Sequence, residues 1–367
     1  MFLALFVYSN FTRLGDTYRY ISGPTSGSGN WLFNSTLMMD VLAHSASIFL
    51  GQVLANFPFM VLSFIGIYYA VKRIDLTSKQ LLTLLAFLSL PNFGIWTSIA
   101  SKEAVAVFFL GVILGFIIDL IKSNPKKNFL LVSFAFYLCA IFKPQYLIGI
   151  SAILIYIFLS QKLSLKGVGK AILLVLFFIF SFSALYFFRS EINELSYIIP
   201  SHFRLDAGST RENTIWVNYL DVFWNAPYGT YIAFVGPTMA EAFSKPTHLF
   251  AWLESMFILA VFFIALLKLL VITYKTGRLN IYYVGLFLTV TLWILFVHYP
   301  FGALNPGSAI RYREGFFSFL VILFYFLYVE SLKRYRGDLQ PLKIPSNLKL
   351  QKTNERALGK YKIEPEK

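Results

Sequence analysis

The segment from Arg13 to Asn30 is the most polar part of a strongly apolar chain, and it follows directly after the first apolar run. Its acidic residue is Asp16, and the charged or aromatic residues around it are Arg13, Tyr18, Arg19 and Tyr20. A carboxylate can take a proton from a hydroxyl, arginine binds phosphate through a rigid fork of donors, and aromatic rings stack on sugars. The segment therefore favours a sugar and phosphate site. An interfacial tyrosine belt with an aspartate that caps a short helix is the alternative.

A second acidic residue, Glu103, lies in the short polar stretch 101–103. Two interpretations are open for it. Glu103 supports Asp16 in one catalytic site, or Ser101 caps the next helix and Glu103 lies in its first turn, where the helix dipole favours an acid.

Arg311 and Arg313 follow Pro306 and Gly307 near the last apolar run. In an extended chain, residues two positions apart point to the same side, and a Pro-Gly turn would present both arginines. Such a pair could clamp a diphosphate. Anchoring at lipid headgroups is the alternative.

Two further arginines, Arg204 and Arg211, flank Asp206 in a long polar segment. They are candidates for phosphate binding, and local ion pairs in a solvated loop explain them equally well.

Lys143 and Glu254 are ionisable residues at membrane depth. Such residues are costly in lipid and usually face a cavity or a partner, so both are candidate binding residues. His298 could pair with Glu254 because both are near the outer ends of their spans. Snorkelling to the interface is the alternative, above all for Lys143.

The composition is that of an integral membrane protein, with 57% hydrophobic residues and a mean hydropathy of +0.65. The net charge of +14 comes from clusters at the ends of apolar runs, which argues against nucleic-acid binding.

The single cysteine, Cys139, excludes an internal disulfide and a cysteine metal cluster, and it is expected to serve packing. The four histidines are not spaced as metal ligands are, for example as His-Xaa-Xaa-Xaa-His. The sequence therefore gives little support to an all-histidine metal site, and the metal ligands, if there are any, are unknown.

Apolar periodicity and length predict an all-α polytopic bundle of about ten spans. They are a stub within 1–9 and the runs 48–71, 80–99, 104–121, 128–142, 146–160, 171–188, 248–273, 280–298 and 315–332. One domain, 1–336, is expected to be followed by a mobile, basic cytoplasmic tail, 337–367.

Basic residues fall at alternate turns, and positive charge is retained on the cytoplasmic side of a membrane. This rule predicts cytoplasmic N- and C-termini. The polar stretches then lie outside, namely 10–47, 101–103, 143–145, a long loop of about 189–247, and 299–314. An enzyme that works at the outer leaflet needs its polar segments on one face.

The arrangement resembles membrane glycosyltransferases of the type C fold, in which one acidic residue lies in a long first outer loop and another in the next short outer loop. Asp16 and Glu103 occupy these positions. Further motifs follow in a set order: Lys143-Pro144-Gln145 starts a span, Pro237 and Glu241 precede the acidic span residue Glu254, and the stretch 305–313 precedes the last span. This order is similar to that in multi-pass proteins of bacterial polysaccharide clusters, including O-antigen polymerase-like ones. The chain departs from the type C pattern in lacking Asp-Xaa-Asp and a full first helix.

The resemblance implies an enzyme of the bacterial inner membrane that transfers sugars from polyprenyl-(di)phosphate carriers at the outer face. It leaves open a single-sugar transferase or a repeat-unit polymerase, and a divalent metal ion as cofactor. Partners in a glycan-assembly complex are also open. The rivals are a transporter or flippase for lipid-linked glycans and a non-catalytic subunit of such a complex.

Overall fold

The computed structural model describes residues 1–23, 29–123, 128–203, 210–276 and 280–339, and within these ranges the chain is helical without strands. The all-α prediction is confirmed. The helices are α1 (Thr17–Ser22), α2 (Ser35–Leu54), α3 (Phe57–Val71), α4 (Ser78–Leu88), α5 (Pro91–Thr97), α6 (Lys102–Ile121), α7 (Phe129–Phe142), α8 (Pro144–Lys162), α9 (Gly167–Phe187), α10 (Arg189–Ile198), α11 (Asp221–Trp224), α12 (Ala226–Val235), α13 (Met239–Ala242), α14 (Pro246–Thr276), α15 (Ile281–Ala303) and α16 (Pro306–Leu339).

Seven of the described helices are long and apolar enough to cross a membrane, or eight if α4 and α5 form one bent span. The ten predicted spans are therefore not confirmed. α3 and α7 are apolar but have only 15 and 14 residues, and crossing the hydrocarbon layer takes about 20. The stub forms a short π-helix, Leu3–Val7, followed by a 3-10 helix, Tyr8–Asn10.

The predicted span 48–71 is wrong, because the chain breaks within it. Gly51 adopts φ 77° and ψ 166°, which are not helical, and α3 begins only at Phe57. α2 instead starts at Ser35, where the Asn34 side chain accepts hydrogen bonds from the backbone N–H groups of Thr36 and Leu37. Asparagine is a preferred N-terminal cap because it satisfies these otherwise unpaired donors.

The predicted span 80–99 is bent by 72° between α4 and α5. Pro91 explains the bend, since proline disfavours helical backbone in the residue before it, and Leu90 adopts an extended ψ of 137°. As a result α5 turns toward α14, where the Asn92 N–H donates to Glu254 Oε2 at 3.1 Å.

The predicted long loop of about 189–247 is largely helical where it is described, and contains α10 to α13. Its α12 packs against α15 and α16. The approach is close because of glycine: a Cβ on Gly229 would lie 1.8 Å from the Tyr299 ring, and one on Gly302 would lie 2.6 Å from Ala233. The sequence pattern missed this packing because these helices are short.

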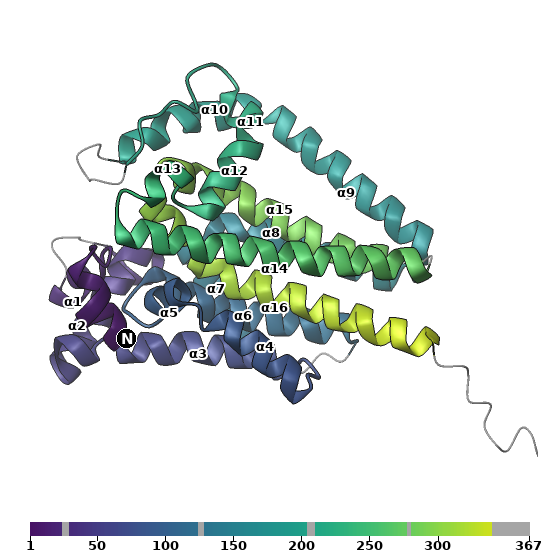
Figure 1. Cartoon of the computed structure of the whole chain (residues 1–367), viewed down its shortest axis with the longest axis horizontal. Coiled ribbons are helices and arrows are strands. Elements are labelled where there is room, and N and C mark those ends of the chain that lie inside the picture. The colour runs from purple at the N-terminus through teal and green to yellow at the C-terminus, as the bar shows by residue number, and fades with distance from the viewer. Residues whose placement is uncertain (24–28, 124–127, 204–209, 277–279, 340–367) are drawn as a thin grey trace, which may run out of the picture.

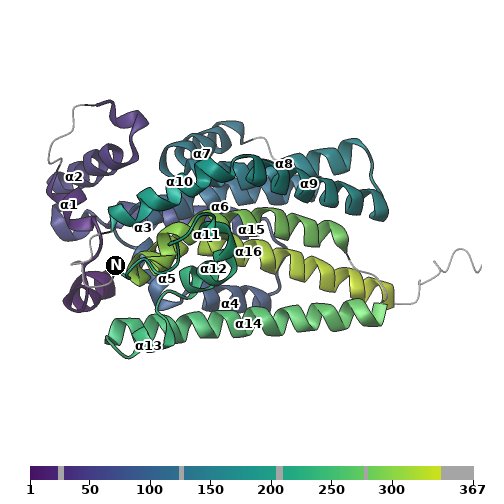
Figure 2. The ribbon, with the colours of Figure 1, turned by 90° about the horizontal axis from the view of Figure 1, so that it is seen from above.

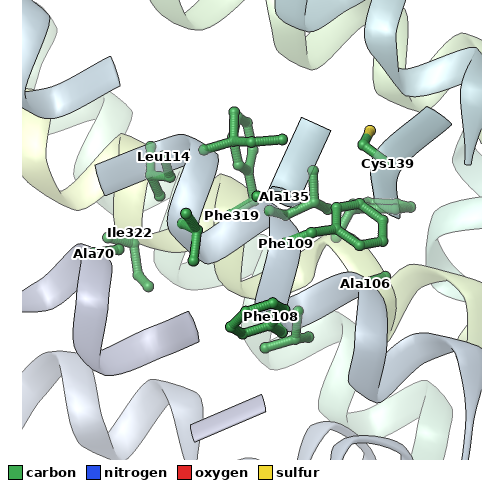
Figure 3. Close-up of a cluster of buried hydrophobic side chains, with 14 of the residues drawn as sticks. Ala70, Ala106, Phe108, Phe109, Leu114, Ala135, Cys139, Phe319 and Ile322 are labelled. Carbon is green, nitrogen blue, oxygen red and sulfur yellow. The ribbon is translucent and has the colours of Figure 1, made fainter. Parts of the chain in front are cut away.

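The core is centred on α6, which is buried almost throughout and packs against α3, α7 and α16. Phe109, Phe319 and Ile322 belong to one buried cluster there, and Cys139 lies at the edge of the same cluster, as its expected packing role requires (Figure 3). A Cβ on Gly111 would lie 2.3 Å from the Gly66 carbonyl, so glycine lets α3 and α6 touch through their backbones.

The long helices run side by side, so the bundle has two ends (Figure 1). One end, the polar end, holds α1, α5 and α13; the other, the basic end, holds the turns after α3 and α8 and the end of α16. Figure 2 shows α14 along one flank and α7 to α9 along the other, with α6 and α16 between them. The first residue lies at the polar end, opposite the end of α16 (Figures 1 and 2).

Candidate functional site

Three residues far apart in the sequence meet at the polar end. Arg311 in the second turn of α16 places Nη2 3.2 Å from Asp16 Oδ2 and Nε 3.3 Å from Glu103 Oε1. The guanidinium thus bridges the two predicted acidic residues, which come from the segment before α1 and from the first turn of α6.

Gly15 makes room for this contact. Its φ is +58°, a left-handed value that favours glycine, and a Cβ there would lie 2.3 Å from Arg311 Nη1. The Thr17 hydroxyl, one residue beyond Asp16, donates to the Ala100 carbonyl at 3.1 Å and fixes α1 to the turn before α6. The backbone around Asp16 is therefore shaped to bring its carboxylate to Arg311.

Glu103 is positioned by the start of α6. The Ser101 hydroxyl accepts from the Ala104 N–H at 3.0 Å, so the predicted helix cap is present and does not compete with the meeting of Glu103 and Arg311. The Glu103 side chain is 1% exposed, and its Oε2 has no hydrogen-bond partner among the described residues. An unsatisfied buried carboxylate oxygen is costly, so the contact of the other oxygen, Oε1, with Arg311 is an interaction that offsets the burial of Glu103.

The three charged groups differ in access to solvent. The Asp16 side chain is 43% exposed, that of Arg311 is 17% exposed, and Glu103 is closed off. Asp16 is therefore the acid that a molecule at the surface can reach. The Tyr20 hydroxyl lies 3.5 Å from Asp16 Oδ2, and burial together with the charge of Asp16 raises the pKa of Tyr20, so it stays protonated near neutral pH.

Arg19 links Asp16 to a third acid that the sequence analysis missed. Its Nε lies 3.8 Å from Asp16 Oδ1, and its Nη1 lies 3.3 Å from Asp40 Oδ1. Asp40 is 3% exposed and lies in the part of α2 that precedes the predicted span. An acid among apolar residues was a signal that could have found it.

Two lysines complete the cluster. Lys102 Nζ donates to the hydroxyls of Ser35 and Thr36 at 3.1 and 2.8 Å. Lys143 Nζ lies 4.5 Å from the centre of the Tyr312 ring and interacts electrostatically with Glu103. The cluster of Asp16, Arg19, Asp40, Lys102, Glu103, Lys143 and Arg311 thus has three acids and four bases, a balance that suits an anionic ligand. Arg13 and Tyr18 are exposed beside it.

Arg313 does not join Arg311. The expectation of an extended pair is wrong, because both residues lie in α16, and two positions on a helix are about 200° apart. Arg313 is fully buried, where its guanidinium pairs with Glu314 at 2.6 Å and Glu254 at 3.5 Å. It also donates to the Ser255 hydroxyl at 2.5 Å. Since these contacts enclose it, a diphosphate clamp cannot include Arg313 in this conformation.

Glu254 has partners other than the expected one. Its carboxylate accepts a hydrogen bond from the Asn92 N–H and pairs with Arg313. His298 Nε2 instead lies 2.9 Å from the Ala233 carbonyl oxygen. The proposed pair of Glu254 and His298 is therefore not formed. Glu254 belongs to the buried network that joins α5, α14 and α16.

Arg211 is a structural clamp in this conformation. It pairs with Glu241 at 2.5 Å and donates to the carbonyls of Ala303 and Gly236, both at 2.7 Å. Partial burial alone would raise the pKa of Glu241, but hydrogen bonds from Arg211 and Thr238 lower it to about 2. The other candidate of this pair, Arg204, lies outside the described residues, as does Asp206.

No group of three or more histidine, cysteine, aspartate or glutamate side chains in the described part of the chain could hold a metal ion. The divalent ion that the resemblance leaves open has no ligand set here and stays a prediction.

Comparisons of the chain with protein-family models, curated proteins and solved structures gave no match. The resemblance to type C glycosyltransferases therefore rests on the positions of Asp16 and Glu103 alone, and the resemblance to polysaccharide-cluster proteins rests on the order of motifs along the chain.

Proposed function

We propose that the protein is a glycosyltransferase that acts on polyprenyl-(di)phosphate-linked sugars at the polar end of the bundle. The observation that carries this proposal is the meeting of Asp16, Glu103 and Arg311 in one partly exposed cluster. Two acids and a fixed arginine supply a base and a phosphate ligand within one small volume. In a bacterium the pathway would be assembly of a surface polysaccharide at the inner membrane.

In the proposed reaction, Asp16 accepts the proton of an acceptor hydroxyl as that oxygen bonds to the anomeric carbon of the donor sugar. The bond between the anomeric carbon and the phosphate oxygen breaks, and the phosphate leaves with the electron pair. Arg311 stabilises this developing charge, with Lys143 and Arg19 as further cations. Glu103 holds Arg311 in place from the buried side.

A binding role without chemistry is the second candidate, and one observation favours it. The buried group of Arg313, Glu254 and Glu314 lies within helices that are long enough to span a membrane, where ionisable residues often mark transport pathways. A flippase for lipid-linked glycans would use such a group and would not need the basicity of Asp16.

Asp16→Asn separates the two candidates, because it keeps the size of the side chain and removes its basicity. We expect glycan formation in cells to fall about 10²–10⁴-fold, with protein level and membrane insertion unchanged. Asp75→Asn is the matched control, since Asp75 is an exposed acid paired with Lys122 at the basic end. Full activity of the Asp16 variant would exclude it as the base and favour the binding role.

A further inference from the structure

A cavity of about 210 Å³ lies between α4, α14 and α16, and it is separate from the cluster around Arg311. Its walls are mainly aliphatic and aromatic, with Leu84, Phe87, Phe262, Val321 and Phe324 among them. The α14 side borders the lipid-facing surface, because Phe263, Leu266 and Leu267 beside it are exposed. We call this cavity the α14 groove.

Two polar groups at the α14 groove lack a partner in the described part of the chain. Lys268 is exposed, and no described residue forms an ion pair or hydrogen bond with its ammonium group. The Tyr328 ring stacks on Phe324, while no described hydrogen bond satisfies its hydroxyl. By contrast the hydroxyl of Tyr325, also in the wall, donates to the Gln80 carbonyl at 3.0 Å.

The depth of Lys268 argues against a free ammonium group in hydrocarbon. α14 runs from the polar end to the basic end and ends at Thr276, so Lys268 lies about 12 Å before its end (Figure 1). A charged side chain at such depth usually has a partner or reaches the headgroup layer. The leaflet at the basic end is the one whose phosphates this lysine can reach.

We propose that the α14 groove binds an anionic glycerophospholipid from the leaflet at the basic end. One acyl chain lies against Leu84, Phe262 and Phe324, and the phosphate takes the Lys268 ammonium and the Tyr328 hydroxyl as donors. The apolar walls favour a hydrocarbon chain, and the ammonium group of Lys268 favours a negatively charged headgroup. The proposal does not depend on the glycosyltransferase reaction, whose site is at the other end of the bundle.

The test is lipid binding to the purified full-length protein in detergent, measured by native mass spectrometry with phosphatidylglycerol and with phosphatidylcholine. We expect the wild type to prefer phosphatidylglycerol. Lys268→Gln should reduce that preference about fivefold, which is the effect of one basic residue near an anionic surface. Lys275→Gln is the matched control, because Lys275 is an exposed lysine in the last turn of the same helix and outside the groove.

A second variant tests the hydrocarbon part of the site. Ala265→Phe fills the groove while Lys268 remains. Binding of both lipids should therefore fall, whereas the preference for phosphatidylglycerol over phosphatidylcholine should persist. Thermal stability in detergent checks that this variant is folded. Equal losses for Lys268→Gln and Lys275→Gln would show attraction to the whole basic end and overturn the site. Displacement of phosphatidylglycerol by equimolar polyprenyl phosphate would assign the groove to an isoprenoid and overturn it as well.

Discussion

At the scale of single residues, Arg311 and Arg313 show how position on one helix separates two identical side chains. Arg311 is partly exposed between two acids from different segments, whereas Arg313 is enclosed by Glu254 and Glu314. Arg311 can exchange its exposed partner Asp16 for a ligand while it keeps its buried partner Glu103. Arg313 cannot, because leaving a buried charge unpaired costs several kcal/mol.

Arg311→Lys should lower the proposed transferase activity although it keeps the positive charge. A lysine is a single point charge, and it cannot reproduce the fork that holds Asp16 and Glu103 together. The measurement is accumulation of lipid-linked glycan in cells, beside Arg311→Ala.

The comparison variant is Arg313→Lys. We expect it to lower the thermal midpoint in detergent, while the activity per amount of folded protein falls less than it does for Arg311→Lys. If Arg311→Lys retains full activity and only Arg311→Ala fails, the cluster needs positive charge alone, and the proposed geometry of the phosphate site is wrong.

At the scale of helices, glycines, a proline and a helix-capping motif decide which segments touch. Gly66 and Gly111 let α3 and α6 meet through their backbones, and Pro91 turns α5 away from the line of α4. α13 is held by a capping box, in which Thr238 and Glu241 bond reciprocally. Such local features position the polar end against the long helices.

Gly111→Ala should destabilise the protein, because the added methyl group would lie 2.3 Å from the Gly66 carbonyl. Overpacking of this kind costs about 1–3 kcal/mol. Gly94→Ala is the matched control: Gly94 is also helical, and a Cβ there meets nothing within 4 Å. We expect the thermal midpoint in detergent to fall for Gly111→Ala and to stay or rise for Gly94→Ala. Equal midpoints would refute the close contact of α3 and α6.

The pair of Glu241 and Arg211 should give a pH-dependent contribution to stability. The folded pKa of Glu241 is about 2 against an ordinary value of 4.5, so the stabilising contribution is present above pH 4.5 and is lost as pH falls toward 2. The difference in thermal midpoint between wild type and Glu241→Gln should be constant from pH 5 to 7, according to the same linkage. It should shrink below pH 4.5. A difference that grows on acidification would contradict this assignment.

At the scale of the whole molecule, the two ends of the bundle differ in charge and structure. The polar end gathers the cluster around Arg311 and α10 to α13, and the basic end carries exposed lysines such as Lys162 and Lys166 (Figure 1). Because positive residues are retained in the cytoplasm, the basic end is expected there.

Reporter fusions at Lys126 and Thr210 test this orientation. We expect alkaline phosphatase to be inactive at Lys126 and active at Thr210, because the enzyme folds only outside the cytoplasm. Green fluorescent protein fusions at the same positions should give the opposite pattern. Phosphatase activity at Lys126 would show that the orientation is the reverse of the predicted one. The proposed reaction could then not take place at the outer leaflet.

The sequence alone determined the all-α membrane class, because an apolar run long enough to cross hydrocarbon can bury its backbone polar groups only as a helix. It also pointed to Asp16 and Glu103, since their polar stretches interrupt an apolar chain. Helix breaks were harder to predict: Gly51 and the bend before Pro91 lie inside the segments 48–71 and 80–99, each of which was predicted as one span.

Only the tertiary structure decided which charges meet. Arg311 reaches Asp16 and Glu103 across 295 and 208 positions of the chain. Arg313, two residues away, turns into the core because α16 is helical there, and Asp40 joins the cluster through Arg19. Sequence spacing fixes neighbours within one helix, whereas contacts between helices depend on their packing, which is set by close approaches such as Gly66 on Gly111.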